Sequence, residues 1–388
     1  MDKVILGLLR TRGFVVFGLL LVFAFALKAA PFVPSNPPEM QPLTNRHSPA
    51  FEAAKRFMRG VNLGDYLENG GPNPITVAAD EFALIRSEGF DHVRVPVAWH
   101  RYAGPAPEFR ISSNIFSKVD FVVTNALANR LAVIVNIHHF NDFDRNPEGA
   151  ADKLAALWRQ IAAHYAGFPE QLAFEIDNEP HQAATTAAVN PIYPRIIAEM
   201  RRTNPKRTIF VEPGNWGNIE EITNLVLPPD DNLIVSAHCY EPFFFTHQGA
   251  PWAGADVKVI GIQFPGPPAR PLAIDPSLEL SDGVRERIDR YNTLTGDQNP
   301  SSARVFREKL ALARAWSDHY GRPVHIGEFG CYSKADAESR ARFYTEFRRA
   351  LDDQKLGWAM WDWSSNFRYW DRANHRPAPG MREALFGK

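Results

Sequence analysis

The sequence is poor in cysteine and has no excess of charge of either sign. Its two cysteines, Cys239 and Cys331, lack the Cys-x-x-Cys or Cys/His spacing of a structural metal site. Both come near the ends of predicted strands, which leaves a disulfide or two buried thiols as interpretations, and the second is favoured. With 43 basic and 44 acidic side chains, the net charge of −1 gives no indication of a nucleic-acid partner.

The sequence also lacks internal repeats and a glycine-rich phosphate-binding turn. The first predicted strand is followed by NLGDYLENGGPNP, which does not have the G-x-G-x-x-G spacing of dinucleotide-binding folds. This absence disfavours an open doubly wound sheet. Aromatic residues, by contrast, are plentiful at 12%, with nine tryptophans, which suits either a large core or a surface that stacks on flat apolar faces.

A long apolar run occurs at the N-terminus. About 15 uncharged residues, 13–27, follow Lys3, Arg10 and Arg12, and this run is shorter than the ~20 residues that span a bilayer. The pattern is typical of a signal peptide, and an uncleaved inner-membrane anchor is the alternative. Either case predicts export, to the periplasm or out of the cell. The chain is accordingly divided into residues 1–30, signal peptide or anchor, residues 31–50, a proline-rich linker, and residues 51–388, a single folded domain.

Eight short apolar stretches in the body are interpreted as buried strands. In order, they are FMRGVNLG, HVRVPV, LAVIVNIH, LAFEIDN, TIFVEPG, LIVSAHCY, PVHIGEFG and LGWAMWDW. Amphipathic stretches separate most of them; in residues 151–165, Leu154, Trp158 and Ile161 share one helical face, so Trp158 is expected to pack in the core. Strands that alternate with helices predict parallel pairing, and eight such units predict an α/β fold, the closed (β/α)8 TIM barrel.

One connection, after the sixth strand, is much longer than the others. Residues 241–300 are rich in proline, glycine and aromatic side chains. Loops of this length in a compact domain usually serve a function. In a barrel the loop would lie over the face where the strands end, and His247, Gln248 and Trp252 either contact a ligand there or pack the loop itself. Three further aromatic residues that follow strands have the same two interpretations: Tyr66, Trp99 and Trp216.

Polar residues collect at the predicted C-terminal ends of the strands, which is where barrel enzymes hold their active sites. They are Arg94, Asn136, His138, His139, Asn178, Glu179, His238, Tyr240 and Glu328, joined by Trp361. Six different strands contribute to this set. Because a buried carboxylate without a partner is costly, packing alone does not account for Glu179 and Glu328.

Two carboxyl groups across a barrel mouth suit the cleavage of a glycosidic bond. That reaction needs one protonated carboxyl group to assist the leaving oxygen, and one ionised carboxylate to attack or to activate water. Their neighbours must separate the two pKa values. Arg94 favours the ionised form of one glutamate, and Tyr240 is placed to donate a hydrogen bond to the same carboxylate. Asn178, directly before Glu179, is suited to hold a substrate hydroxyl.

The motifs RGVNLG, HVRVPVAW, VIVNIHH, NEP, AHCY, IGEFG and GWAMWDWSSN follow one another between residues 57 and 367. Together they resemble glycoside hydrolase family 5, the large cellulase family of retaining (β/α)8 enzymes. The resemblance implies that Glu179 is the acid/base and Glu328 the nucleophile, with their carboxyl groups ~5 Å apart. It further implies substrate-binding roles for Arg94, His138, Asn178, His238, Tyr240 and Trp361, the last as the floor of the sugar site.

The resemblance also implies a β-linked polysaccharide or oligosaccharide as substrate, with no cofactor and no metal, and we expect a monomer. An endo-β-1,4-glucanase is favoured because the NLG, HQG and EPF stretches look cellulase-like. β-Mannanase, β-1,3-glucanase and exo-glucosidase activities are the alternatives on the same barrel. A catalytically silent carbohydrate-binding barrel is disfavoured because a binding protein has no need of both glutamates.

A metal-dependent hydrolase is the competing chemistry. Asp142 and Asp144, in HHFNDFDRN, are close in sequence to His138 and His139, and these side-chain types bind metals. Such a site would give Glu179 and the other strand-end residues no shared role, so it is disfavoured. It predicts that activity is lost on chelation and regained with a divalent ion.

Overall fold

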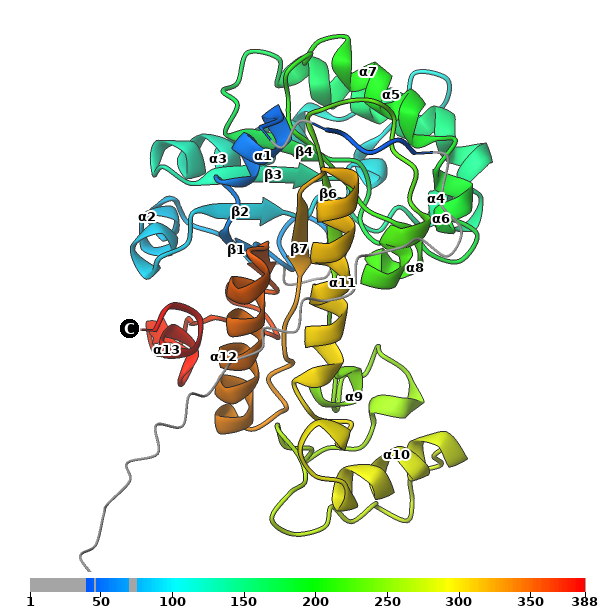
Figure 1. Ribbon diagram of the computed structural model, residues 1–388. Coiled ribbons are helices and arrows are strands. Elements are labelled where there is room, and N and C mark those ends of the chain that lie inside the picture. The colour runs from blue at the N-terminus through cyan, green and yellow to red at the C-terminus, as the bar shows by residue number, and fades with distance from the viewer. Residues whose placement is uncertain (1–39, 45–46, 70–74, 388) are drawn as a thin grey trace, which may run out of the picture. The chain divides into compact units, whose positions relative to one another are not determined.

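Residues 40–44, 47–69 and 75–387 are described by the computed structural model shown in Figure 1. Eight parallel strands form a closed barrel in sequence order, and β8 closes the ring against β1. The predicted (β/α)8 architecture is therefore confirmed. The expected signal peptide or anchor, residues 1–30, lies outside the described residues. Within the part that is described, no helix combines the length and apolar character needed to cross a membrane.

The barrel strands are short, and each matches one of the eight apolar stretches. They are β1 (Arg59–Asn62), β2 (His92–Val95), β3 (Ala132–Asn136), β4 (Leu172–Glu175), β5 (Ile209–Val211), β6 (Leu233–His238), β7 (Val324–Glu328) and β8 (Gly357–Met360). All their residues except Arg59 are buried, because one face fills the barrel interior and the other meets the surrounding helices. A small antiparallel pair, β9 (Trp370–Asp371) and β10 (Arg376–Pro377), follows β8.

Helices surround the barrel and connect successive strands (Figure 1). They are α2 (Ala79–Glu88), α3 (Ser113–Ala128), α4 (Asn141–Arg145), α5 (Pro147–His164), α6 (Thr186–Val189), α7 (Tyr193–Arg201), α8 (Gly214–Gly217), α11 (Arg304–Tyr320), α12 (Ala337–Gln354) and α13 (Met381–Phe386). In α5, Trp158 is buried and its indole N–H donates to the carbonyl oxygen of Ile176 at 2.8 Å. Its expected packing role is confirmed. The β5–β6 connection holds only α8 and a 3₁₀ turn, Ile219–Asn224.

A short helix, α1 (Pro49–Ala54), closes the N-terminal end of the barrel. Its alanines share a buried cluster with Phe57 and with interior residues of the strands. The ring of Phe57 meets that of Phe210 edge to face, with 5.2 Å between their centroids. Met40 is buried as well, so the described end of the expected 31–50 linker packs against the barrel. A filled lower end leaves the opposite end, where the strands terminate, for ligands.

The long connection after β6 is folded and contains a helix that the sequence analysis did not place. In order it holds α9 (Phe243–Thr246), a 3₁₀ turn (Ala255–Val257), α10 (Asp282–Thr293) and a second 3₁₀ turn (Gly296–Gln298). Helix α10 begins after Ser281, whose hydroxyl accepts a hydrogen bond from the N–H of Val284. Val284, Ile288 and Tyr291 are buried on one face. Their i, i+4, i+7 spacing was a helical signal that could have been found in the sequence.

The two cysteines are free and buried. Burial raises the pKa of Cys239 and of Cys331 to about 12, which keeps both thiols protonated at neutral pH. The favoured expectation of two buried thiols is therefore confirmed.

Candidate active site

Arg94, on β2, organises the C-terminal end of the barrel. Its buried guanidinium group donates hydrogen bonds to Glu175 Oε2 at 2.6 Å, Glu328 Oε1 at 2.7 Å, Asn178 Oδ1 at 2.7 Å, Asn62 Oδ1 at 2.9 Å and Glu212 Oε1 at 3.2 Å. Burial by itself lowers the pKa of Arg94, but the surrounding carboxylates outweigh burial and raise it. Because the guanidinium group is rigid and planar, these contacts fix side chains from neighbouring strand ends relative to one another.

Glu328 is the last residue of β7, and both of its carboxylate oxygens accept hydrogen bonds. Arg94 donates to Oε1 at 2.7 Å, and the Tyr240 hydroxyl donates to Oε2 at 2.8 Å. Burial raises the pKa of Glu328 and the charge of Glu179 adds to this rise, while His238 and Arg94 oppose it. Two donors on two oxygens hold the carboxylate as an acceptor, which is the form that can attack as a nucleophile.

Glu179 follows β4 in an uncommon backbone conformation. Its φ angle is +53°, in the left-handed region that residues other than glycine rarely adopt. Its N–H donates to Glu212 Oε2 at 2.9 Å, and its Oε1 lies 2.8 Å from His238 Nδ1. Buried Glu212 thus holds the backbone and His238 holds the side chain, so the surroundings sustain a strained residue at the site.

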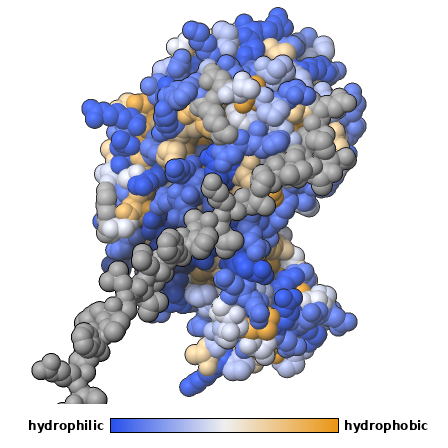
Figure 2. Space-filling model, viewed as in Figure 1, coloured by the Kyte–Doolittle hydropathy of each residue, from blue (hydrophilic) through white to orange (hydrophobic). Residues whose placement is uncertain are grey.

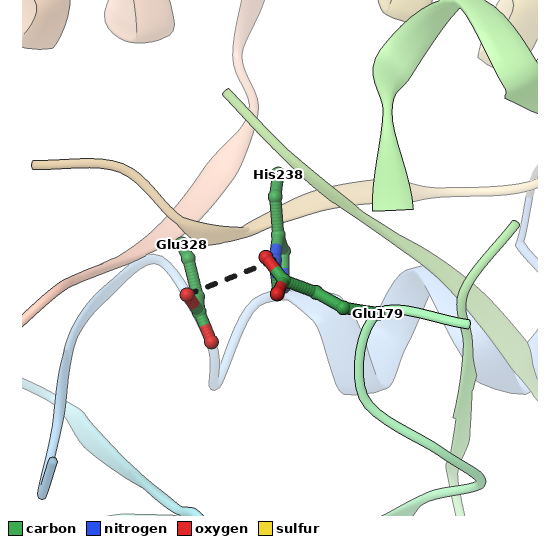
Figure 3. Close-up of side chains that lie close together, drawn as sticks. All are labelled: Glu179, His238 and Glu328. Carbon is green, nitrogen blue, oxygen red and sulfur yellow. Dashed lines mark hydrogen bonds and ion pairs between the residues drawn. The ribbon is translucent and has the colours of Figure 1, made fainter. Parts of the chain in front are cut away.

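The two glutamates face each other across the cleft (Figure 3). One oxygen of each carboxylate lies within 4.8 Å of the other, and a ring nitrogen of His238 is equally close to both. This separation agrees with the ~5 Å expected for a retaining glycosidase and is shorter than the ~6.5–9.5 Å of an inverting one. No room is left for a water molecule to attack from the far side of a sugar.

His238 controls where the proton of this pair resides. Its Nδ1 lies 2.8 Å from Glu179 Oε1, and its Nε2 lies 3.1 Å from Glu212 Oε1. Burial alone lowers the pKa of His238, but the carboxylates of Glu212, Glu328 and Glu179 raise it well above the ordinary value. Burial likewise raises the pKa of Glu179, and the hydrogen bond from His238 outweighs burial and lowers it. One proton is therefore held in the His238–Glu179 hydrogen bond.

Three residues of the network were not predicted from the sequence: Asn62, Glu175 and Glu212. Asn62 and Glu212 stand at or just past the ends of β1 and β5, so the strand-end criterion that selected the others could have found them. Glu175 lies within the β4 stretch, and only the contact with Arg94 shows that its side chain is part of the site. Burial raises the pKa of Glu175 to about 7, against the opposing effect of Arg94.

His138 and Trp361 stand next to each other in the wall of the cleft. Their rings are stacked, with centroids 5.7 Å apart and an interplanar angle of 12°. Burial lowers the pKa of His138 well below the ordinary value, so the imidazole is neutral and can donate or accept a hydrogen bond. With these two, the structure brings together all eight side chains that the sequence analysis assigned to the site.

The cleft above the glutamates has a volume of about 1030 Å³. Trp216 and Trp252 line it with 53% and 57% of their surfaces exposed, as suits stacking on sugar rings. His247 also lines the cleft. Gln248 does not, since it is buried and hydrogen-bonds to backbone groups of its own loop. Trp99 is fully buried, with its indole N–H on the carbonyl oxygen of Asn136, and is a packing residue.

The metal site considered from the sequence does not form. Asp142 is exposed and pairs with Arg145 and Lys153, while Asp144 pairs with His181. Among the described residues, the group that converges closely enough for a metal is Glu179, His238 and Glu328. This group does not fit a cation, because His238 is held protonated and has no free lone pair, and Arg94 already neutralises Glu328.

Comparison with known proteins places the chain among cellulases. A family model described as "Cellulase (glycosyl hydrolase family 5)" matches residues 56–367, which include both glutamates. Endoglucanase H of Acetivibrio thermocellus is 26% identical over 330 residues, covering 84% of this chain and 31% of that protein. Endoglucanase 3 of Fibrobacter succinogenes is 27% identical over 360 residues, covering 87% and 54%. The chain thus spans about a third to a half of the length of these relatives.

Solved structures agree with the sequence relatives. Endoglucanase Cel5A from Thermotoga maritima is 32% identical, with a TM-score of 0.75, over 87% of this chain and 100% of that chain. Structures of that enzyme are described in complex with cellobiose and with mannotriose. The cellulose synthase subunit Z from Clostridioides difficile is 26% identical, with a TM-score of 0.73, over 85% of this chain and 99% of that chain.

Proposed function

Because the chain belongs to glycosyl hydrolase family 5, the cellulase family, we propose that it is a retaining endo-β-1,4-glucanase. Such an enzyme cleaves β-glucosidic bonds inside a polysaccharide chain. The observation that carries the proposal is the pair of facing glutamates, whose carboxylate oxygens lie within 4.8 Å of each other in the cleft. Carboxyl groups and water supply all the chemistry of this reaction, so no cofactor is required.

In the first step, a carboxylate oxygen of Glu328 attacks the anomeric carbon of the bound sugar. The bond from that carbon to the glycosidic oxygen breaks, and its electron pair stays on the oxygen. Glu179 delivers to this oxygen the proton that it shares with His238. The product is a glycosyl ester on Glu328, and the leaving sugar departs. Arg94 and Tyr240 aim Glu328 by holding both of its oxygens.

In the second step, Glu179 changes from acid to base. Ester formation removes the negative charge of Glu328, and with it the repulsion that disfavours a charge on Glu179. Glu179 then accepts a proton from water, the water oxygen attacks the anomeric carbon, and the bond to Glu328 breaks. Two inversions retain the β configuration. The Nδ2 of Asn178 makes no hydrogen bond within the described residues and is available to a sugar hydroxyl.

A β-1,4-glucan is the proposed substrate, and mannan is the second candidate. The glucan is favoured because both curated relatives are endoglucanases and because exposed Trp216 and Trp252 offer flat faces along the cleft. Mannan is supported by Thermotoga maritima Cel5A, which is 32% identical and is described with mannotriose as well as cellobiose. Glucan and mannan differ in the orientation of the sugar 2-hydroxyl, so contacts to that group decide between them.

Turnover of a panel of polymers tests the function. We expect hydroxyethylcellulose and mixed-linkage β-glucan to lose viscosity before many reducing ends appear, with slower release from galactomannan and laminarin. Proton NMR of the first products is expected to show the β-anomer, and a chelator is expected to leave the rate unchanged. Binding without any release of reducing ends would instead identify a silent carbohydrate-binding barrel. An α-anomer as first product would exclude the proposed double displacement.

We also propose that the chain is a monomer exported by its N-terminal segment. The proposal rests on the basic residues and short apolar run within residues 1–30. Fusion of residues 1–50 to alkaline phosphatase, which is active only outside the bacterial cytoplasm, is expected to give active reporter. N-terminal sequencing of the mature protein then distinguishes a cleaved signal from a retained anchor. An inactive reporter with normal expression contradicts export, and light scattering reports the oligomeric state.

A further inference from the structure

A second cavity, of about 690 Å³, adjoins the substrate cleft. It lies between α9, the start of α11 and α10, which Figure 1 draws side by side. The two cavities share four lining residues: Glu241, Phe243, Ala253 and Gly254. Nothing in the two-step reaction uses this space. It is formed by the long connection after β6, so it belongs to the part of the chain that the barrel itself does not require.

Arginine side chains dominate the charge of this cavity. Arg287 and Arg290, one turn apart on α10, line it together with Arg304 at the start of α11. Arg304 is committed to the carbonyl oxygen of Asp297 and to Glu308. By contrast, neither Arg287 nor Arg290 has a carboxylate partner among the described residues. Two guanidinium groups are thus available to a ligand.

The acidic residues of the cavity do not cancel these charges. Glu241 lies 3.4 Å from the ammonium nitrogen of Lys309, which also contacts Glu220 at 2.6 Å. Asp256 is the other acidic residue of the lining, and it is exposed. The cavity therefore carries more positive than negative charge, although the whole chain has a net charge of −1.

Aromatic rings accompany the arginines. The guanidinium carbon of Arg287 lies 5.8 Å from the centre of the Phe244 ring, which holds the side chain by a cation–π contact. Phe243 is 42% exposed and lines both cavities, so a sugar stacked on it would reach from one to the other. Figure 2 shows a mainly hydrophilic surface over this part, interrupted by apolar residues. Stacking faces beside free guanidinium groups suit a carbohydrate that carries negative charge.

We propose that Arg287 and Arg290 form a binding site for anionic substituents, such as carboxylates, on the polysaccharide chain that the cleft hydrolyses. The proposal rests on the function proposed above and narrows its substrate to an acidic glucan. Guanidinium groups match carboxylate and phosphate oxygens in pairs, which gives specificity beyond simple attraction. A charged group on a sugar held beyond the scissile bond would enter this space while its neighbours occupy the cleft.

Carboxymethylcellulose and neutral hydroxyethylcellulose, compared at low ionic strength, test the site. The double variant Arg287→Ala, Arg290→Ala is expected to raise KM for carboxymethylcellulose by about three- to tenfold, because two partly exposed ion pairs are lost. KM for hydroxyethylcellulose and kcat for both are expected to stay unchanged. The matched control is Arg270→Ala, Arg285→Ala, which removes the same charge from exposed positions of the same connection that do not line the cavity.

Each other result has a definite meaning. Equal changes in KM for both polymers, or equal effects of both double variants, overturn the proposal in favour of structural damage or general charge. A thermal shift with inorganic phosphate that only the Arg287/Arg290 variant loses, with unchanged polymer kinetics, identifies a site for free anions and also overturns it. If the parent protein hydrolyses neither polymer, the proposed function fails. Affinity electrophoresis in gels containing each polymer then still decides whether the arginines select the charged one.

Discussion

Replacement of Glu328 by glutamine is expected to lower kcat by more than about 10⁴-fold, because an amide cannot form the glycosyl ester. Glutamine has the same shape, and its oxygen can still accept the hydrogen bond that Arg94 donates at 2.7 Å. The folded state should therefore persist. Release of dinitrophenolate from 2,4-dinitrophenyl β-cellobioside measures the rate, and thermal unfolding followed by circular dichroism measures the fold.

A matched control and a chemical trap make this test specific. Glu338→Gln changes an exposed carboxyl group on α12, whose side chain is 88% accessible, and is expected to keep the full rate. A 2-deoxy-2-fluoro β-cellobioside with a good leaving group should slow the second step and leave its sugar on Glu328, where peptide mass spectrometry can locate it. An adduct on another residue, or more than about 1% of the parental kcat in the glutamine variant, rules out Glu328 as nucleophile.

Removal of Glu179 is expected to have an effect that depends on the leaving group. With a soluble glucan, Glu179→Ala should lower kcat/KM by about 10²–10⁴-fold, because the departing sugar oxygen needs a proton. With 2,4-dinitrophenyl β-cellobioside the first step needs no acid, so a burst of dinitrophenolate equal to the enzyme concentration should precede slow turnover. Stopped-flow absorbance measures both the burst and the steady rate.

Azide separates a lost acid/base from a damaged site. It attacks the glycosyl ester without a general base, so it should restore turnover of the aryl glycoside by Glu179→Ala and yield a β-glycosyl azide. Glu179→Gln should behave in the same way while it keeps a hydrogen-bonding partner for His238, which lies 2.8 Å from the native carboxylate. The assignment does not survive if both leaving groups are slowed equally and azide has no effect.

Much of this site was predictable because a polar residue is out of place at the end of a buried strand. Glu328 and His238 are the last residues of β7 and β6, and each ends a short apolar run. Glu212 was missed although it meets the same criterion, since no partner in the sequence suggests its role. The structure shows that its carboxylate accepts a hydrogen bond from the N–H of Glu179 and contacts Arg94.

The exposed aromatic residues show where sequence patterns are insufficient. Trp99 and Trp216 both follow strands and had equal standing as cleft residues, yet Trp99 is fully buried and Trp216 is 53% exposed. Gln248 and Trp252, four residues apart, likewise separate into a brace within the loop and a face of the cleft. Side-chain direction in a loop depends on its distant contacts, so local sequence does not specify it.

By itself, the sequence determined the eight-stranded barrel and the identity of the two facing glutamates, because strand periodicity and strand-end polarity are local properties of the chain. Only the tertiary structure decided which proton each carboxyl group holds and which side chains reach the cleft. Those properties arise where Arg94 and His238 meet carboxylates from other strands, and where α10 turns two arginines toward a cavity beside the cleft. Such contacts join residues far apart in the sequence, and burial sets their strength.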